Sequence, residues 1–111
     1  MSENNKVQHA EFTRSGVQGS ISDIARITAK AIKGIVGADS VERRAKDVYV
    51  IKKNYIEWKL FPPGTFDDQY PRHWRITVEA LNNEHNHTSP NQQKMFEDDL
   101  KQIITILIRY H

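Results

Sequence analysis

The chain has 111 residues, 38% of them hydrophobic and 27% charged, so it is long enough for one hydrophobic core and too short for two. It contains no cysteine, which excludes disulfides, thiolate zinc sites and cysteine nucleophiles. The formal net charge of +2 is only mildly basic, below what is typical of a dedicated nucleic-acid-binding protein.

The sequence also bears on where in the cell the protein is located and on whether it spans a membrane. No apolar run approaches the ~20 residues that cross a bilayer. The first residues, MSENNKVQHAEFTRSG, lack the continuous apolar segment of a secretory signal and are not acid-poor like a transit peptide. We therefore expect a cytoplasmic protein without a membrane span.

Residues 1–19 are polar and show no sustained hydrophobic period, which predicts a flexible N-terminal tail. Residues 20–111 are expected to form a single domain.

The first predicted element of this domain is a helix. Ser20 or Ser22 can cap its start, and Ser20 with Asp23 forms a variant of the capping box. Gly37 is the natural stop of this helix. Its predicted apolar stripe combines a row at helical spacing with the residues that widen it: Ile24, Ile27, Ala31 and Ile35, with Ala25, Thr28, Ile32 and Val36.

The segment 38–46 is compatible with a further helical turn capped by Asp39 or Ser40, or with an exposed loop, and the short helix is favoured. Two strands then follow, Val48 to Ile51 and Tyr55 to Phe61, because apolar and polar residues alternate in them. Asn54 lies between them and tolerates the left-handed conformation of a tight turn, so a hairpin is predicted.

A third alternating segment, Trp74 to Leu81, predicts another half-buried strand after a loop over residues 62–71. The polar stretch 82–90 is expected to be a loop that ends at a helix start near Pro90. The last segment favours a helix, although Ile103 to Tyr110 is rich enough in isoleucine to form a strand instead. Together these elements predict an α+β fold, a small two-layer domain ordered helix, three-stranded antiparallel sheet, helix.

Residues that carry catalytic chemistry are sparse. His85 and His87 form a His-x-His pair in an expected loop, but two ligands do not make a zinc site. Asp67-Asp68 is explained by a turn, and Asp98-Asp99 by the favourable N-terminal dipole of the closing helix. Neither a nucleophile elbow nor a glycine-rich phosphate loop is present. We therefore expect no enzyme, with no catalytic residues, no metal site and no cofactor.

A basic stripe is the strongest functional signal. Arg26, Lys30 and Lys33 share one face of the first helix, and Arg43 and Arg44 follow soon after, so these five residues are candidates for phosphate or nucleic-acid contact. A charged outer helix face explains the same residues without any ligand. The open face of the predicted sheet offers one aromatic candidate, Tyr49, and otherwise mixes charges, unlike the aromatic platform of a single-strand RNA binder.

Self-association is a further expectation. A three-stranded sheet is marginal alone and leaves two edges open, and the apolar face of residues 24–36 exceeds what such a sheet covers. The leading hypothesis is a non-enzymatic scaffold or regulatory module that binds protein partners, itself included, through the first helix and a sheet edge. The alternative is a nucleic-acid-binding regulatory protein that uses the basic helix face. No small-molecule substrate is evident.

The first half of the chain resembles the bacterial alkaline-shock protein family. The resemblance lies in the run ISDIARI, the exit IKGIVG and the hairpin that follows, and these motifs consist of common residues. The proline-rich loop, the longer third strand and the closing helix without a final strand depart from that family. The resemblance implies a self-associating, non-enzymatic scaffold related to the cell envelope or to stress, and it supplies no site residues.

Overall fold

The computed structural model describes residues 8–13, 19–65, 73–81 and 90–109. These residues form five strands, two α-helices and one 3-10 turn. In chain order the elements are β1 (Gln8–Phe12), α1 (Ile21–Val36), β2 (Ser40–Arg43), η1 (Ala45–Asp47), β3 (Tyr49–Lys53), β4 (Ile56–Phe61), β5 (Trp74–Ala80) and α2 (Pro90–Arg109).

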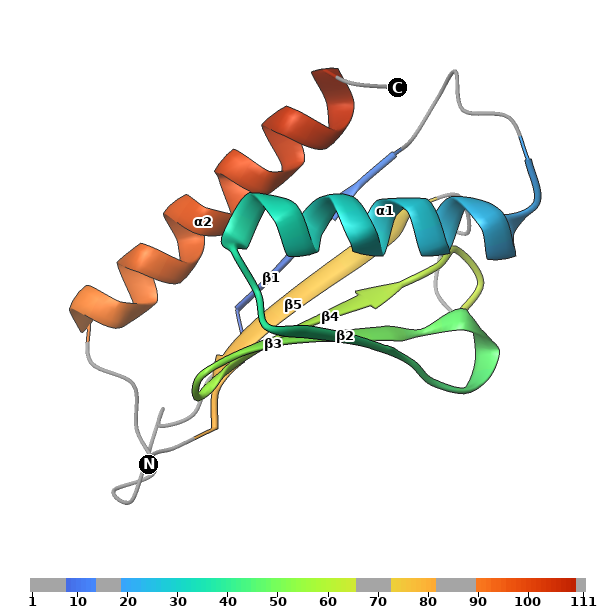
Figure 1. Ribbon diagram of the computed structural model, residues 1–111. Helices are drawn as coiled ribbons and strands as arrows, with labels where there is room; N and C mark the ends of the chain where they lie inside the picture. The colour runs from blue at the N-terminus through green and yellow to red at the C-terminus, as the bar shows by residue number, and fades with distance from the viewer. Residues whose placement is uncertain (1–7, 14–18, 66–72, 82–89, 110–111) are drawn as a thin grey trace.

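The five strands make one fully antiparallel sheet in the order β1-β5-β4-β3-β2. Both helices lie on the same side of this sheet (Figure 1). α2 packs on β1 and β5, whereas α1 packs on β2, β3 and β4, and the two helices touch each other. The result is a two-layer α+β architecture with one covered and one open sheet face.

The α+β class is confirmed, but the expected three-stranded sheet is wrong, because the sheet has five strands. The two additional strands are the edges. β1 lies inside the segment 1–19, where the sequence predicted a flexible tail, and β2 lies in the segment where a short helix was favoured. The segments QHAEF and SVER contain too few apolar residues to show the pattern of a half-buried strand. Each is specified instead by pairing with its longer neighbour, β1 with β5 and β2 with β3.

The predicted boundaries of α1 are confirmed at both ends. Ser20 Oγ accepts a hydrogen bond from the Asp23 amide at 3.1 Å. Gly37 takes the left-handed conformation, with φ 70° and ψ 39°, and its amide donates to the Lys33 carbonyl. The hairpin turn is confirmed as well, since Asn54 has φ 55° between β3 and β4.

α2 resolves the choice between helix and strand at the end of the chain, because it extends through Arg109. It also corrects the explanation given for Asp98 and Asp99. The helix begins at Pro90, so both carboxylates lie well inside it, beyond the first turn where the dipole favours acidic groups. Neither α1 nor α2, the two α-helices that the described residues form, is long and apolar enough to cross a membrane.

The core lies between the covered sheet face and the helices. Its fully buried members come from every layer and include Ile32, Ile51, Leu60, Ile76, Phe96 and Ile103. Tyr49 belongs to this core, with 7% of its surface exposed, because it pairs with Leu60 and shares its side of the sheet. The prediction that Tyr49 lies on the open face is therefore wrong.

The open sheet face carries charges of both signs, as the sequence predicted. Arg75 on β5 bonds Glu11 on β1, with Nη2 2.6 Å from Oε2. Glu57 lies between two lysines, 3.9 Å from Lys52 and 3.8 Å from Lys59. Pairs of this kind contribute little individually, ~0–1 kcal/mol. Their mixed signs give this face no net preference for an anionic ligand.

Candidate functional surfaces

Three of the predicted cations lie together on the solvent-facing side of α1. Arg26 and Lys30 are exposed and Lys33 is partly exposed. Their spacing of four and three residues places them in one row along the helix. The prediction that these three residues share a face is therefore consistent with the structure, whereas their binding of phosphate stays a prediction.

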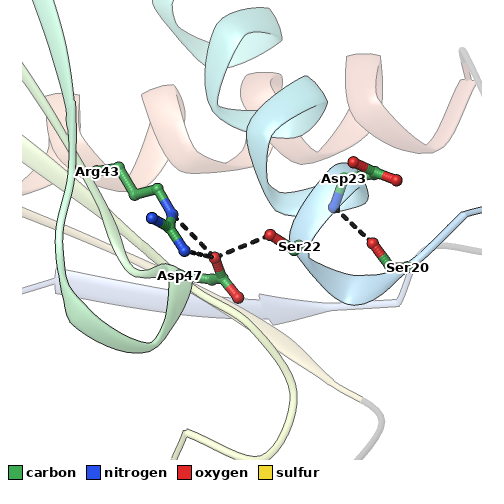
Figure 2. A network of polar contacts seen from close by, with 5 residues as sticks. All are labelled: Ser20, Ser22, Asp23, Arg43 and Asp47. Atoms are coloured by element: carbon green, nitrogen blue, oxygen red, sulfur yellow. Dashed lines mark hydrogen bonds and ion pairs between the residues drawn. The ribbon is translucent and has the colours of Figure 1, made fainter.

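Arg43 has a structural partner that the sequence did not reveal. Its Nε and Nη2 both donate to Asp47 Oδ1, at 3.0 and 2.8 Å, and Ser22 Oγ donates to the same oxygen at 3.1 Å. Figure 2 shows Arg43 and Ser22 converging on Asp47 from opposite sides. The network therefore joins the end of β2 to the first turn of α1.

The electrostatics of this network keep Asp47 ionised. The hydrogen bond from Arg43 lowers the pKa of Asp47, and the bond from Ser22 lowers it further, whereas desolvation opposes them. The same pairing raises the pKa of Arg43. Because its guanidinium already holds a carboxylate, Arg43 is a poorer phosphate ligand than its sequence position suggested.

The backbone beside this network is unusual. Lys46 and Asp47 have φ values of 60° and 61°, in the left-handed region that non-glycine residues rarely adopt. The Arg44 amide donates to the Val48 carbonyl at 2.6 Å across this turn. The three bonds to the Asp47 carboxylate hold the turn against α1 and so offset the local strain.

The other two arginines also face carboxylates. Arg44 lies 3.3 Å from Glu42 and Arg26 lies 3.7 Å from Asp23, both on exposed surface. Among the residues that the structure describes, Lys30 and Lys33 have no carboxylate partner. The five predicted cations are thus not an equivalent set, because three are partly neutralised by neighbours within the chain.

An apolar row runs beside the cations on α1, and the sequence placed it on the wrong side. Ile27 is 45% exposed, and Ala31 and Gly34 are exposed as well. The sequence assigned Ile27 and Ala31 to the buried stripe. The buried face is in fact rotated away from them and consists of Ile24, Ala25, Thr28, Ala29 and Ile32. Helical periodicity defines a stripe, but the packing partner decides which part of a wide stripe is covered.

A second feature is a cavity of about 280 Å³ at the turn end of the β3–β4 hairpin. One wall comes from the last turn of α1, the second from the hairpin and the third from the middle of α2. Its polar lining residues are Lys53, Asn54, Asp99 and Gln102, and its apolar lining includes Ile56, Trp58 and Ile103. No pattern in the sequence predicted this cavity, since its walls lie far apart along the chain.

Four of the residues weighed for catalysis or metal binding fall in segments that the structure does not describe. His85, His87, Asp67 and Asp68 lie outside the described residues. Within the described part of the chain, no three histidine, cysteine or acidic side chains gather closely enough to hold a metal ion.

The fold defines a two-layer α+β protein with a five-stranded antiparallel sheet covered on one face. Comparisons with known proteins match no family model, no curated protein and no solved structure. The resemblance to the alkaline-shock protein family therefore stays a prediction.

Proposed function

We propose that this chain is a non-enzymatic protein-interaction module that binds an acidic partner polypeptide through the outward surface of α1. The observation that carries the proposal is the exposed row Ile27, Ala31 and Gly34. Each member directly follows a cation in the sequence, in the pairs Arg26-Ile27, Lys30-Ala31 and Lys33-Gly34. An apolar row and a basic row therefore run side by side along the helix. We call these six residues the α1 surface.

Two residue choices on the α1 surface are costly for the chain alone. Glycine inside a helix costs ~1 kcal/mol relative to alanine. A Cβ at Gly34 would meet no atom within 4 Å, so crowding among the described residues does not require the glycine. Ile27 has only moderate helix propensity and is 45% exposed, so burial does not explain it either. Both choices suit close approach by another polypeptide.

The charges favour a particular kind of partner. An apolar stripe bordered by acidic side chains complements Ile27 and its neighbouring cations. A second copy of this chain is less favourable. In a two-fold dimer with antiparallel α1 helices the same flank of both copies would meet, and the cations would face each other. Self-association was predicted from the sequence, but the proposal does not assume it. The experiment below tests it as an alternative to an acidic partner.

Nucleic-acid binding is the second candidate function. It is favoured by Lys30 and Lys33, which have no carboxylate partner among the described residues. It is weakened at Arg43 and Arg44, whose guanidinium groups already face carboxylates. A phosphate backbone would also make no use of Ile27 or Gly34.

A binding assay with matched variants separates the candidates. The probes are a synthetic amphipathic peptide with an Ile/Ala stripe bordered by glutamate, and a random-sequence DNA duplex. Binding of each to the full chain is followed by fluorescence anisotropy at about 50 and 500 mM salt, because screening weakens electrostatic contacts more than apolar ones. The test variant is Ile27→Asp. Its control is Ile108→Asp on α2, since Ile108 is the same residue type and is 49% exposed.

The proposal expects peptide binding that Ile27→Asp abolishes and Ile108→Asp preserves. Gly34→Ala is expected to weaken binding too, because the added methyl group obstructs close approach. Duplex binding that vanishes at high salt and ignores Ile27→Asp would shift the function to nucleic acid. Light scattering that shows a dimer disrupted by Ile27→Asp, with no peptide binding, would make a second copy the partner. If the chain binds neither the peptide nor the duplex and forms no dimer that Ile27→Asp disrupts, the α1 surface is not a functional site.

A further inference from the structure

The cavity at the hairpin end has Trp58 as part of its wall. Trp58 is 3% exposed, and its Nε1 lies below the accessible surface with no hydrogen-bond acceptor among the described residues. The indole therefore contributes an apolar surface to the cavity, and its ring reports on what the cavity holds.

Two opposite charges also line this cavity without pairing. Lys53 Nζ donates to the Val36 carbonyl at 3.2 Å, so its ammonium is held at the last turn of α1. Asp99 lies on the α2 wall and forms no ion pair with any described residue. Burial raises the pKa of Asp99, as does neighbouring Asp98, and the charge of Lys53 only partly offsets this. The carboxylate is therefore partly desolvated, and no described cation lies within ion-pair distance of it.

The remaining walls are apolar, and so is the surface near the cavity. Ile56 and Ile103 line the interior, and Met95, which is 58% exposed, lines it from α2. Tyr55 immediately precedes Ile56, and its carbonyl accepts a hydrogen bond from the Leu81 amide. Tyr55 and Leu81 are 42% and 50% exposed, so large apolar side chains gather at this end of the molecule.

The size of the cavity limits the ligand to a small molecule. An engineered protein cavity of about 150 Å³ accommodates benzene. A volume of about 280 Å³ therefore admits a ring or branched aliphatic group together with two short polar groups.

We infer that this cavity binds a small zwitterion with an apolar body, of the class of the hydrophobic amino acids. The ligand ammonium pairs with Asp99. Its carboxylate lies toward Lys53, and its apolar body packs against Ile56, Trp58 and Ile103. This occupant supplies a counter-charge to Asp99 and to Lys53. The site is separate from the α1 surface, so it does not depend on the proposed function.

Nuclear magnetic resonance tests this inference on the full chain. The chain has two tryptophans, and the indole resonance that disappears in Trp58→Phe belongs to Trp58. L-phenylalanine is the first probe. Phenethylamine, which lacks the carboxylate, and 3-phenylpropionate, which lacks the ammonium, are the second and third. The test variant is Asp99→Asn, and the control is Asp98→Asn, the same change at the exposed neighbouring position.

We expect L-phenylalanine to shift the Trp58 indole resonance in a saturable manner, and each truncated probe to bind more weakly. Loss of a charge-assisted hydrogen bond costs ~1.5–3 kcal/mol, so Asp99→Asn should weaken binding about tenfold or more. Asp98→Asn should leave the affinity within about twofold, since a solvated charge contributes little.

Three results would overturn the inference. The first is no saturable shift with any probe. The second is equal weakening by Asp98→Asn and Asp99→Asn, which would place the ligand outside the cavity. The third is binding of 3-phenylpropionate as tight as that of L-phenylalanine, which would remove the ammonium from the recognition. Trp58→Phe serves only to assign the indole resonance, so its own affinity for the probes does not matter. The affinities are compared in the Asp99 and Asp98 variants, which retain Trp58.

Discussion

Thr28 on α1 offers a direct test of how the helix packs on the sheet. The residue is fully buried, with 0% of its surface exposed, and its Oγ1 has no hydrogen-bond partner among the residues that the structure describes. Thr28→Val replaces the hydroxyl with a methyl group of nearly the same size. Valine and threonine have similar helix propensities, so the substitution changes the burial of a polar group and little else.

The expected gain follows from two terms. Burying an unpaired hydroxyl costs ~1–3 kcal/mol in proteins. Burying one additional methyl group contributes ~0.8 kcal/mol. Some of each term is lost to adjustment of the neighbouring side chains, so we expect Thr28→Val to raise the free energy of unfolding by about 1–2 kcal/mol. The melting temperature should rise by about 4 °C for each kcal/mol in a domain of this size.

Urea denaturation followed by tryptophan fluorescence measures this change, because the midpoint should rise while the slope stays constant. Thr105→Val on the exposed side of α2 is the matched control and should change stability by less than about 0.5 kcal/mol. If Thr28→Val is no more stable than the original chain, the Thr28 hydroxyl is satisfied in solution and the described packing of α1 is wrong at this point.

Three other predictions concern separate parts of the fold. Because the folded state lowers the pKa of Asp47, its contribution is present above the unfolded pKa and is lost as the pH falls through the folded value. Asp47→Asn should therefore be less stable near neutral pH, with the difference shrinking in acid, and a constant difference in urea titrations across pH would contradict this. Gly34→Ala should raise the free energy of unfolding by ~0.5–1 kcal/mol, since helix propensity improves and no atom obstructs the new Cβ; destabilisation on thermal melting would show that the site is crowded. Leu60→Ala should cost ~2–5 kcal/mol in urea denaturation, whereas Leu81→Ala at a half-exposed position should cost less than about 0.5 kcal/mol, and similar losses would contradict the assigned core.

The elements that sequence reasoning predicted correctly depend on residues close together in the chain. Ser20 caps α1 through an amide three residues away, and Gly37 ends the helix through its own backbone conformation. Asn54 adopts the left-handed turn conformation between β3 and β4. Capping, turn chemistry and strand alternation are local effects, so a single sequence is sufficient to predict them.

The candidate functional surfaces could be predicted only in part. The shared face of Arg26, Lys30 and Lys33 follows from helical spacing alone. The exposure of Ile27 does not, because a wide apolar stripe can be covered in several orientations and the sheet selects one. Arg43 pairs with Asp47 only four residues away, but the pair spans a turn with positive φ at Lys46 and Asp47, which the sequence did not predict. Ser22, the third member of the network, lies 25 residues from Asp47.

The sequence by itself determined the α+β class, the caps of α1, the central hairpin and the strand β5, because each is encoded within a few consecutive residues. Only the tertiary structure decided the edge strands β1 and β2, the orientation of α1 and the cavity between Lys53 and Asp99. These features arise where segments distant in the chain meet. Their energies come from pairing and packing partners that local periodicity does not identify.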